Sequence, residues 1–388
     1  MILSRVAPLS AVTAGLLAIV IGVTSSAAIV FSAARAAGAG DAELASWMLA
    51  LGVGMGVTCI GLSLRYKAPI VTAWSTPGAA LLATGLDGVT LREATGAFLI
   101  SAALITLSGL TGWFARVMDK VPVPLAGALL GGVLVQFGIR LFAEMRTSFV
   151  LVFTMFAVYL VARRFLARFA VLVALAAGLT VAAIEGSLHL GRVELAWAKP
   201  VFVLPAFSWQ AAIGVALPLF VVTMASQNLP GVAVLRNDGY TNVPISPLIG
   251  WTGAVNLVLA PFGAFGLNLA AITAAICTGP HAHPDPRKRY LAGVWAGVFY
   301  LIVGAFGATV GSLLTALPAA LVLGIAGIGL LGTIGSSLTS AVSDPRWREA
   351  AVVTFLATAS GVSLLGVGSA FWGLIAGLLT AFLVPRPN

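Results

Sequence analysis

Two stretches of this chain share an unusual pattern, APIVTAWSTPGAALLATG at 68–85 and APFGAFGLNLAAITAAICTG at 260–279. Each begins with Ala-Pro, continues through a segment rich in Gly, Pro or aromatic residues, and becomes a small-residue helix that ends in Thr-Gly. A shift of 192 residues places Thr76 on Asn268. Because Thr and Asn are favourable N-cap residues, each stretch is predicted to be an extended strand followed by a half-helix.

The composition around these stretches is that of a membrane protein. Hydrophobic residues make up 60% of the 388 residues and charged residues only 9%. Soluble domains carry about 25% charged residues, so this chain cannot cover its surface in water. The apolar stretch from Val6 to Phe31 is too long for a signal-peptide core, and we expect it to remain as a membrane span.

Apolar windows predict about 14 transmembrane segments. Their approximate bounds are 7–32, 43–63, 68–85, 93–114, 121–139, 149–163, 169–186, 209–234, 246–261, 262–278, 290–311, 317–337, 349–365 and 368–384. The third and tenth segments are the broken ones. Seven segments precede a more polar stretch at 187–206 and seven follow it, and an odd number per repeat inverts the second copy. The expected fold is therefore an all-α membrane protein built from two inverted seven-span repeats, 1–200 and 201–388.

Loop charges support an even number of spans. With alternating sides, 15 of the 21 Lys and Arg residues fall on the side of the N-terminus. Six fall on the other side, and they are Arg35, Arg92, Arg140, Arg146, Arg192 and Lys199. The positive-inside rule then places both termini in the cytoplasm. A reading with twelve spans and two re-entrant segments is the alternative.

The two half-helices suggest an anion site. Helix starts inside a membrane direct free N–H groups and partial positive charge at a shared cavity. Polar residues also occur late in two matching segments. Thr24 and Ser25 lie late in the first segment, and Gln227 and Asn228 lie late in the eighth. The rings of Trp74 and Phe265 could stack on a flat substrate. Ordinary kinked helices, hydroxyls bonded to their own backbone and rings packed in the core are the structural alternatives.

The sequence contains no acidic residue in the middle of a predicted span. Asp87 is the acid nearest to a half-helix, so it is the candidate for proton coupling, although a capping or salt-bridge role is the alternative. His281 and His283 have no third ligand nearby, and Cys59 and Cys277 lie in apolar stretches. We therefore expect no metal, cofactor or disulfide, and nothing in the chain resembles a nucleic-acid surface.

Four stretches resemble the benzoate/proton symporter family of bacterial inner membranes. They are STPGAALLATG (75–85), SQNLPGVAVLRNDGY (226–240), NLAAITAAICTGPHAHPDP (268–286) and RKRY (287–290). The resemblance implies a distant relation to uracil, xanthine and sulfate carriers. It further implies a core formed by 1–114 and 201–311, a gate formed by 115–200 and 312–388, and often a homodimer.

The relation also bears on the substrate. Nucleobase carriers of that fold use acids in the eighth and tenth segments, where this chain has Ser226, Gln227 and Asn268. A neutral, donor-rich site suits a carboxylate, whereas an acid would repel it.

We therefore expect a transporter that imports benzoate or a similar small aromatic carboxylate with a proton by alternating access, and not an enzyme. The carboxylate is expected between Thr76–Gly78 and Asn268–Ala270. The predicted substrate-binding residues are Ser25, Trp74, Ser75, Thr76, Gly78, Gln227, Asn228, Phe265, Asn268, Leu269 and Ala270. A nucleobase or inorganic-anion carrier of the same fold is the main alternative, and a channel or a membrane-embedded enzyme are the others.

Overall fold

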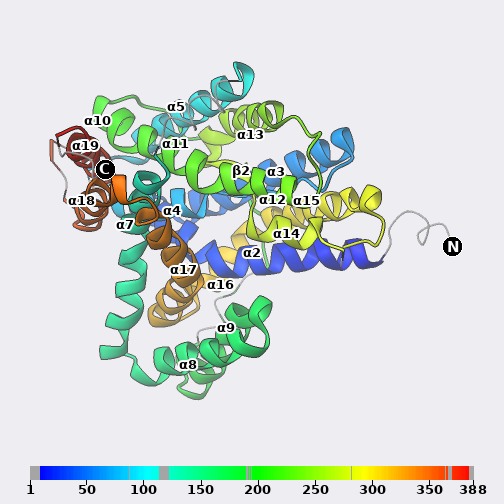
Figure 1. Ribbon diagram of the computed structural model, residues 1–388. Helices are drawn as coiled ribbons and strands as arrows, with labels where there is room; N and C mark the ends of the chain where they lie inside the picture. Colours follow the sequence, from blue (N-terminus) through cyan, green and yellow to red (C-terminus); the bar gives the residue numbers. More distant parts are fainter. Residues whose placement is uncertain are drawn as a thin grey trace.

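The computed structural model describes residues 9–86, 88–112, 122–188, 191, 193, 195–280, 282–362, 364–365 and 369–383. This part of the chain is mostly helical (Figure 1). The elements of the first half are α2 (Leu9–Ala36), α3 (Asp41–Tyr66), β1 (Thr72–Trp74), α4 (Thr76–Gly85), α5 (Leu91–Leu110), α7 (Val123–Ala143), η1 (Glu144–Arg146), α8 (Phe149–Phe165), η2 (Ala167–Phe169) and α9 (Ala170–Ile184).

The second half contains two π-helical turns, η4 and η5, within its first long helical run. Its elements are α10 (Trp209–Ala211), η4 (Ala212–Ala216), α11 (Leu217–Thr223), η5 (Met224–Asn228), α12 (Leu229–Asn237), α13 (Ile245–Leu259), η6 (Ala260–Phe262), β2 (Leu267–Leu269), α14 (Ile272–Thr278), η7 (Pro286–Lys288), α15 (Tyr290–Ala305), α16 (Gly307–Thr315), α17 (Ala319–Ala341), η8 (Pro345–Trp347), α18 (Arg348–Ala359) and α19 (Ser369–Leu383).

Several of these helices are long enough to cross a membrane. Within the described residues, seven helical runs have the required length and apolar composition, and the bent pair α15–α16 would be an eighth. The sequence predicted a single segment at 290–311, but the chain bends by 63° between α15 and α16. At the start of α16, Gly307 packs so closely on α3 that a Cβ there would lie 2.6 Å from the Cβ of Met48.

Each of the two broken segments forms a short strand followed by a helix. The strands β1 and β2 pair antiparallel, with Ala73 opposite Asn268. The strand starts are 195 residues apart (267 − 72) and the helix starts are 196 apart (272 − 76). The predicted shift of 192 residues was therefore wrong by about one helical turn. The N-cap residues of the two helices consequently differ from the predicted ones.

Glycine contacts set the closest helix pairs. A Cβ on Gly52 of α3 would lie 2.5 Å from the Cα of Gly304 on α15. A Cβ on Gly109 of α5 would lie 2.2 Å from the backbone nitrogen of Gly250 on α13. Small residues let transmembrane helices approach until their backbones touch, where dispersion forces are strongest.

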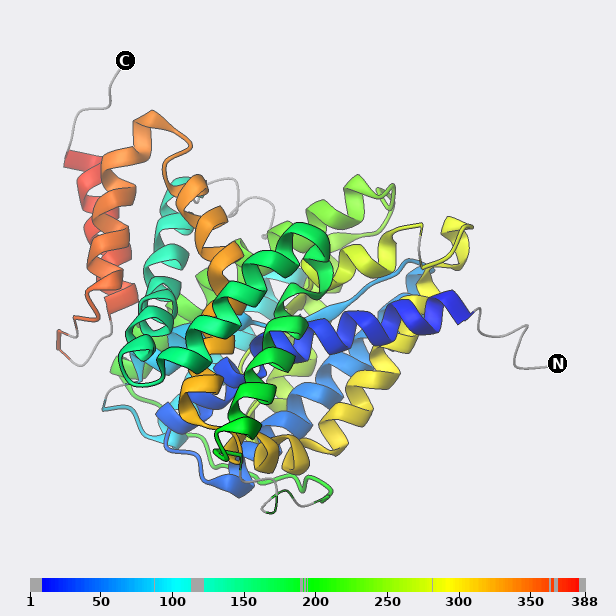
Figure 2. The ribbon, with the colours of Figure 1, turned by 90° about the horizontal axis from the view of Figure 1, so that it is seen from below.

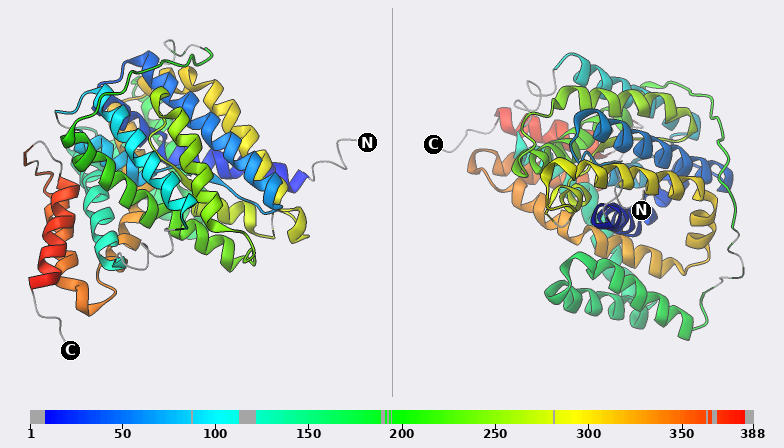
Figure 3. Two further views of the ribbon diagram at one scale, coloured as in Figure 1. Left: turned by 90° about the horizontal axis from the view of Figure 1, so that it is seen from above. Right: turned by 90° about the vertical axis from the view of Figure 1, so that its right-hand side faces the viewer.

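The helices are arranged around a central group with two peripheral hairpins. Helices α8 and α9 form a pair at the lower edge of Figure 1, and α18 and α19 stand together at one side in Figure 2. The extended chain after residue 195 runs along one side of the molecule (Figure 3, right). It is held there because Val203 N donates to Pro261 O (2.8 Å) and Ala206 N donates to Arg92 O (2.9 Å).

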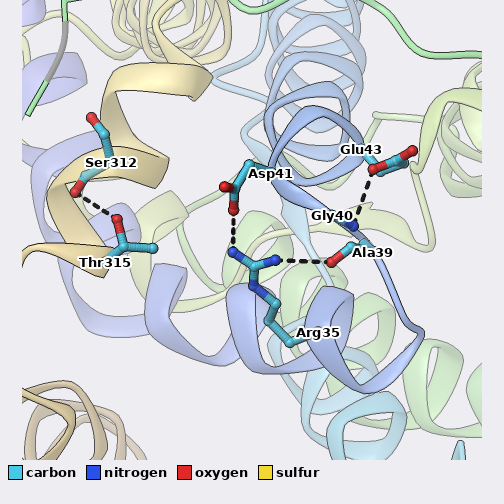
Figure 4. A network of polar contacts seen from close by, with 7 residues as sticks. All are labelled: Arg35, Ala39, Gly40, Asp41, Glu43, Ser312 and Thr315. Carbon is cyan, nitrogen blue, oxygen red and sulfur yellow. Dashed lines mark hydrogen bonds and ion pairs between the residues drawn. The ribbon is translucent and has the colours of Figure 1, made fainter. Parts of the chain in front are cut away.

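The turn between α2 and α3 neutralises one of its cations. Arg35 forms an ion pair with Asp41 and donates to Ala39 O (3.0 Å), as Figure 4 shows. Beside it, Glu43 accepts from Gly40 N (3.0 Å) and completes the N-terminal cap of α3. The guanidinium of Arg35 therefore has its partners within this turn.

Candidate functional site

The two strand–helix units, the η5 turn and helices α2, α15 and α17 enclose a cavity of about 260 Å³. Both halves of the chain contribute to its wall. The lining residues are Ile21, Gly22, Ser25, Ser26, Ala73, Trp74, Thr76, Pro77, Ser226, Gln227, Pro230, Ala270, Ala271, Thr273, Tyr300, Gly329, Leu330, Thr333 and Ser336.

The start of α4 lies at this cavity, but its cap differs from the prediction. Ser75 is the N-cap residue, because its hydroxyl accepts from Gly78 N (3.1 Å). The same oxygen accepts from the Thr223 hydroxyl (3.0 Å). The prediction of Thr76 as the cap was therefore wrong by one residue. Thr76 instead lies inside the first turn and lines the cavity beside Pro77.

The second half-helix also begins later than predicted. Asn268 was expected to cap it, but α14 starts at Ile272 and has Ala271, without a side-chain cap, at its N-cap position. Asn268 is fully buried in β2. With its amide oriented to suit its neighbours, it accepts from Ser75 N (3.1 Å) and donates to Leu269 O (3.0 Å). This side chain therefore joins the two strands behind the cavity wall.

The π-helical turn η5 separates two neighbouring polar residues. Gln227 lines the cavity. Asn228 is fully buried, accepts from Leu269 N (2.9 Å) and donates to the Met224 sulfur (3.2 Å). A π turn shifts the following side chains relative to an α-helix and is frequent at functional sites. Pro230 cannot donate a backbone hydrogen bond, which makes such an irregular turn easier to form here.

The predicted aromatic pair is divided in the structure. Trp74 lines the cavity, and its indole Nε1 donates to the Ser26 hydroxyl (2.8 Å). Phe265 is fully buried and packs against Trp47 and Phe98, with ring centroids 5.8 and 6.2 Å away. The prediction that Phe265 faces the substrate does not match its position. The ring of Tyr300 borders the cavity instead.

The chemistry of the wall is polar but uncharged. Among the described residues that line the cavity, the polar groups are hydroxyls, one amide and the Trp74 indole, and none is Asp, Glu, Lys, Arg or His. Such a wall can donate several hydrogen bonds to a carboxylate without a like charge that would repel it.

Comparison with known proteins decides the family. The sequence profile described as "Benzoate membrane transport protein" (BenE) matches residues 5–383. The chain belongs to the benzoate membrane transport protein family. This family consists of membrane transporters and not of enzymes.

Two known proteins are similar to this chain along nearly their whole length. The chain is 49% identical to the inner membrane protein YdcO of Escherichia coli (strain K12) over 364 residues, covering 94% of this chain and 93% of YdcO. It is 39% identical over 380 residues to the benzoate membrane transport protein of Acinetobacter baylyi (strain ATCC 33305 / BD413 / ADP1), covering 98% and 96%.

Solved structures share the fold at low sequence identity. The transmembrane domain of the cyanobacterial bicarbonate transporter BicA matches with a TM-score of 0.60 and 14% identity, covering 96% of each chain. The overall structure of SLC26A9 matches with a TM-score of 0.64 and 14% identity, covering 96% of this chain and 65% of that one. Murine Slc26a9, an anion transporter in the inward-facing state, has a TM-score of 0.61 at 14% identity over 97% of this chain and 68% of that one.

Five of the eleven predicted substrate residues of this benzoate-family transporter line the cavity. They are Ser25, Trp74, Thr76, Gln227 and Ala270. The other six, Ser75, Gly78, Asn228, Phe265, Asn268 and Leu269, lie behind the wall or within the strand crossing. Asp87, the candidate for proton coupling, lies outside the described residues. The described residues contain no cluster of His, Cys, Asp and Glu that could hold a metal ion.

The prediction missed the contribution of three helices. Thr273 of α14, Tyr300 of α15, and Thr333 and Ser336 of α17 all border the cavity of this family member. In the sequence these residues stand in apolar helices, where most hydroxyl groups only form hydrogen bonds with their own helix. The sequence therefore offers no reason to single them out. Only the packing of α14, α15 and α17 on α2 brings these four side chains to the cavity.

Proposed function

We propose that this transporter imports benzoate or a similar small aromatic carboxylate together with a proton by alternating access. The observation that carries the proposal is the neutral, donor-rich cavity between the two strand–helix units. The family membership supports the substrate class, because the Acinetobacter relative is named a benzoate membrane transport protein.

The cavity suits a flat monoanion with one polar end. The Thr76 hydroxyl and the Gln227 amide are donors for a carboxylate, and hydrogen bonds to charged groups contribute roughly 1.5–3 kcal/mol each. Trp74 and Tyr300 offer aromatic surface for the ring. Ring pairs contribute about 0.5–1.5 kcal/mol beyond their buried area. The two ends of the substrate are thus recognised by different chemistry.

Helix pairing supports the proposal of two inverted repeats of seven segments. In such a repeat α3 of the first half corresponds to α13 of the second, and α5 corresponds to α15. The contact of α3 with α15 should then have a counterpart between α13 and α5, and both pairs are in contact. The same correspondence relates the α8–α9 pair to α18–α19, and the α2–α4 pair to α12–α14. The antiparallel β1–β2 pairing is what an inversion requires.

The same arrangement supports a division into a moving core and a gate. We place 1–114 and 201–311 in the core and 115–200 and 312–388 in the gate. The cavity lies where core residues of α2, β1 and η5 meet α17 of the gate. The relation to nucleobase and sulfate carriers also favours a homodimer, and the mass of the solubilised protein relative to its 39.5 kDa chain tests it.

The cavity extends toward one side of the molecule. Its lining residues run from Ser26 back to Ile21 on α2, and from Gly329 forward to the exposed Ser336 on α17. On this side, Arg346 lies in the η8 turn that follows α17, and Arg236 lies in the last turn of α12. By the positive-inside rule this is the cytoplasm of an inner membrane, so the conformation is inward-facing with both termini inside.

Coupling to one proton makes the transport of a monoanion electrically neutral. The membrane potential then contributes nothing, and each unit of pH difference supplies about 1.4 kcal/mol, or about tenfold accumulation. A carrier of inorganic anions is the second candidate, because the matched BicA and Slc26a9 structures are titled bicarbonate and anion transporters.

Uptake of labelled benzoate into proteoliposomes under an inward pH gradient tests the proposal. We expect accumulation that an uncoupler abolishes and that unlabelled benzoate, but not uracil, bicarbonate or sulfate, competes away. Uptake equal to that of empty liposomes, with bicarbonate or sulfate transported instead, would retain the fold and refute the substrate.

A further inference from the structure

A second, smaller cavity lies at the seam between the core and α7 of the gate. Its volume is about 110 Å³, and its lining residues are Ser32, Ala83, Thr84, Gln136, Phe137 and Arg140. None of these residues lines the central cavity. The seam cavity is thus a separate space bounded by α2, α4 and α7.

The seam cavity lies on the closed side of the transporter. On α2, Ser32 is seven residues beyond Ser25, which is about 10 Å along the helix. Helices α7 and α17 run antiparallel, because Gly127 meets Ser340 and Gly327 meets Leu141. Arg140 therefore lies toward the start of α17, away from Ser336.

Among the described residues that line the seam cavity, Arg140 is the only charged one. Arg35 on the same side forms an ion pair with Asp41, and Arg92 donates to Leu204 O (3.1 Å). The guanidinium of Arg140, by contrast, has no hydrogen bond or ion pair with any residue that the structure describes. Its donors are therefore free for an anion.

The other polar side chains of the seam cavity already donate to backbone carbonyls. The Ser32 hydroxyl donates to Ala28 O (3.0 Å), and the Thr84 hydroxyl donates to Ala80 O (3.0 Å). The Gln136 amide donates to Ala359 O. The planar guanidinium supplies the positive charge at this place, and it matches a carboxylate with two parallel hydrogen bonds.

We propose that the seam cavity is a docking site where Arg140 receives the substrate monocarboxylate from the non-cytoplasmic side before the central cavity opens to it. This inference rests on the proposed function. A guanidinium at a cleft between low-dielectric walls raises the local concentration of anions. The ring of Phe137 in the same wall offers a surface for the aromatic end of the substrate.

Arg140 also lies in the last turn of α7, where a cation stabilises the helix end. Stabilisation of the helix end and docking of the substrate predict different results when Arg140 is replaced. A stabilising role alone would change the amount of folded protein, whereas a docking role changes the apparent affinity from one side of the membrane. Ionic strength also separates them, since screening weakens the attraction of a free anion.

The test is initial-rate benzoate uptake by intact cells that produce Arg140→Gln, Arg140→Lys or the control Arg146→Gln. Arg146 is exposed on the same side and does not line the seam cavity, so the control removes equal charge. We expect Arg140→Gln to raise KM roughly fivefold at unchanged Vmax. Arg140→Lys should recover part of this loss, and high salt should narrow the difference from wild type.

Inside-out vesicles are the matched measurement from the cytoplasmic face, where Arg140→Gln should keep the wild-type KM. An equal KM for Arg140→Gln and Arg146→Gln in cells, with normal wild-type uptake, overturns the docking site alone. A KM raised equally on both faces overturns it as well. Wild-type cells that take up no benzoate overturn the proposed function instead.

Discussion

Gly329 of α17 lies against the backbone carbonyl of Ser25 on α2, so closely that a Cβ on Gly329 would lie 2.6 Å from this oxygen. The proposed core and the proposed gate therefore touch directly at the edge of the central cavity. On α2, the described lining of the central cavity ends one residue farther on, at Ser26, in the direction of Ser32. Under the proposed alternating-access cycle, this contact forms part of the seal that must break.

Gly329→Ala should weaken this seal. The added methyl group forces α2 and α17 apart, and overpacking of this kind costs roughly 1–3 kcal/mol. Labelling of Ser32→Cys by a membrane-impermeant thiol reagent should increase, against a background in which Cys59 and Cys277 are buried. Gly332→Ala is the matched control, because its Cβ would meet nothing within 4 Å. Equal labelling in both variants would contradict the seal.

Ser75 and Thr76 should respond differently to substitution by Ala. Ser75→Ala removes the α4 cap and leaves the Thr223 hydroxyl without its acceptor, so the protein should lose about 1 kcal/mol or more of stability. Thr76→Ala should leave the thermal unfolding temperature nearly unchanged but raise KM for benzoate. Ser75→Thr keeps the hydroxyl and should restore stability. A larger loss of stability in Thr76→Ala than in Ser75→Ala would show that Thr76 is the N-cap residue.

Gln227 and Asn228 form a second contrasting pair. Asn228→Ala leaves the buried N–H of Leu269 unpaired and should destabilise the protein by roughly 1–3 kcal/mol. Gln227→Ala should unfold at nearly the wild-type temperature while its KM rises. Thermal unfolding and uptake measured on the same preparations check both statements. Loss of stability in Gln227→Ala with an unchanged KM would remove Gln227 from the site.

The proposed stoichiometry predicts a particular dependence on driving forces. With one proton per monoanion, an imposed pH gradient of one unit should support about tenfold accumulation. A potassium diffusion potential of either sign should leave this accumulation unchanged. Two protons per substrate would instead add roughly 2.3 kcal/mol per 100 mV, which an inside-negative potential would reveal.

Much of the fold could be predicted because it depends on local properties of the chain. Apolar length determines which segments enter lipid, and Pro and Gly close together favour an interruption of a helix. The strand–helix units at 68–85 and 260–279 follow from such rules. The bend after Ala305 was missed, since the close approach of Gly307 to Met48 is a contact between distant segments.

The candidate site could be predicted only in part. Polar residues late in the first and eighth segments indicated where it lies, and Ser25 and Gln227 do line the cavity. Asn268 was misplaced because an Asn side chain can either cap a helix or form hydrogen bonds between crossing strands. The local sequence does not distinguish the two. The choice between them depends on whether Ser75 N is within reach, and this atom lies in the other half of the chain.

The sequence alone determined that this chain is a membrane protein of the benzoate transport family with two interrupted segments, because hydrophobic length, helix breaking and motif identity are properties of contiguous residues. Only the tertiary structure decided which polar groups face the cavity. The β1–β2 register, the π turn at Gln227 and Asn228, and the contact of Gly329 with Ser25 all join residues far apart or shift a helix face. Their free energies depend on packing between segments, which no single stretch of sequence contains.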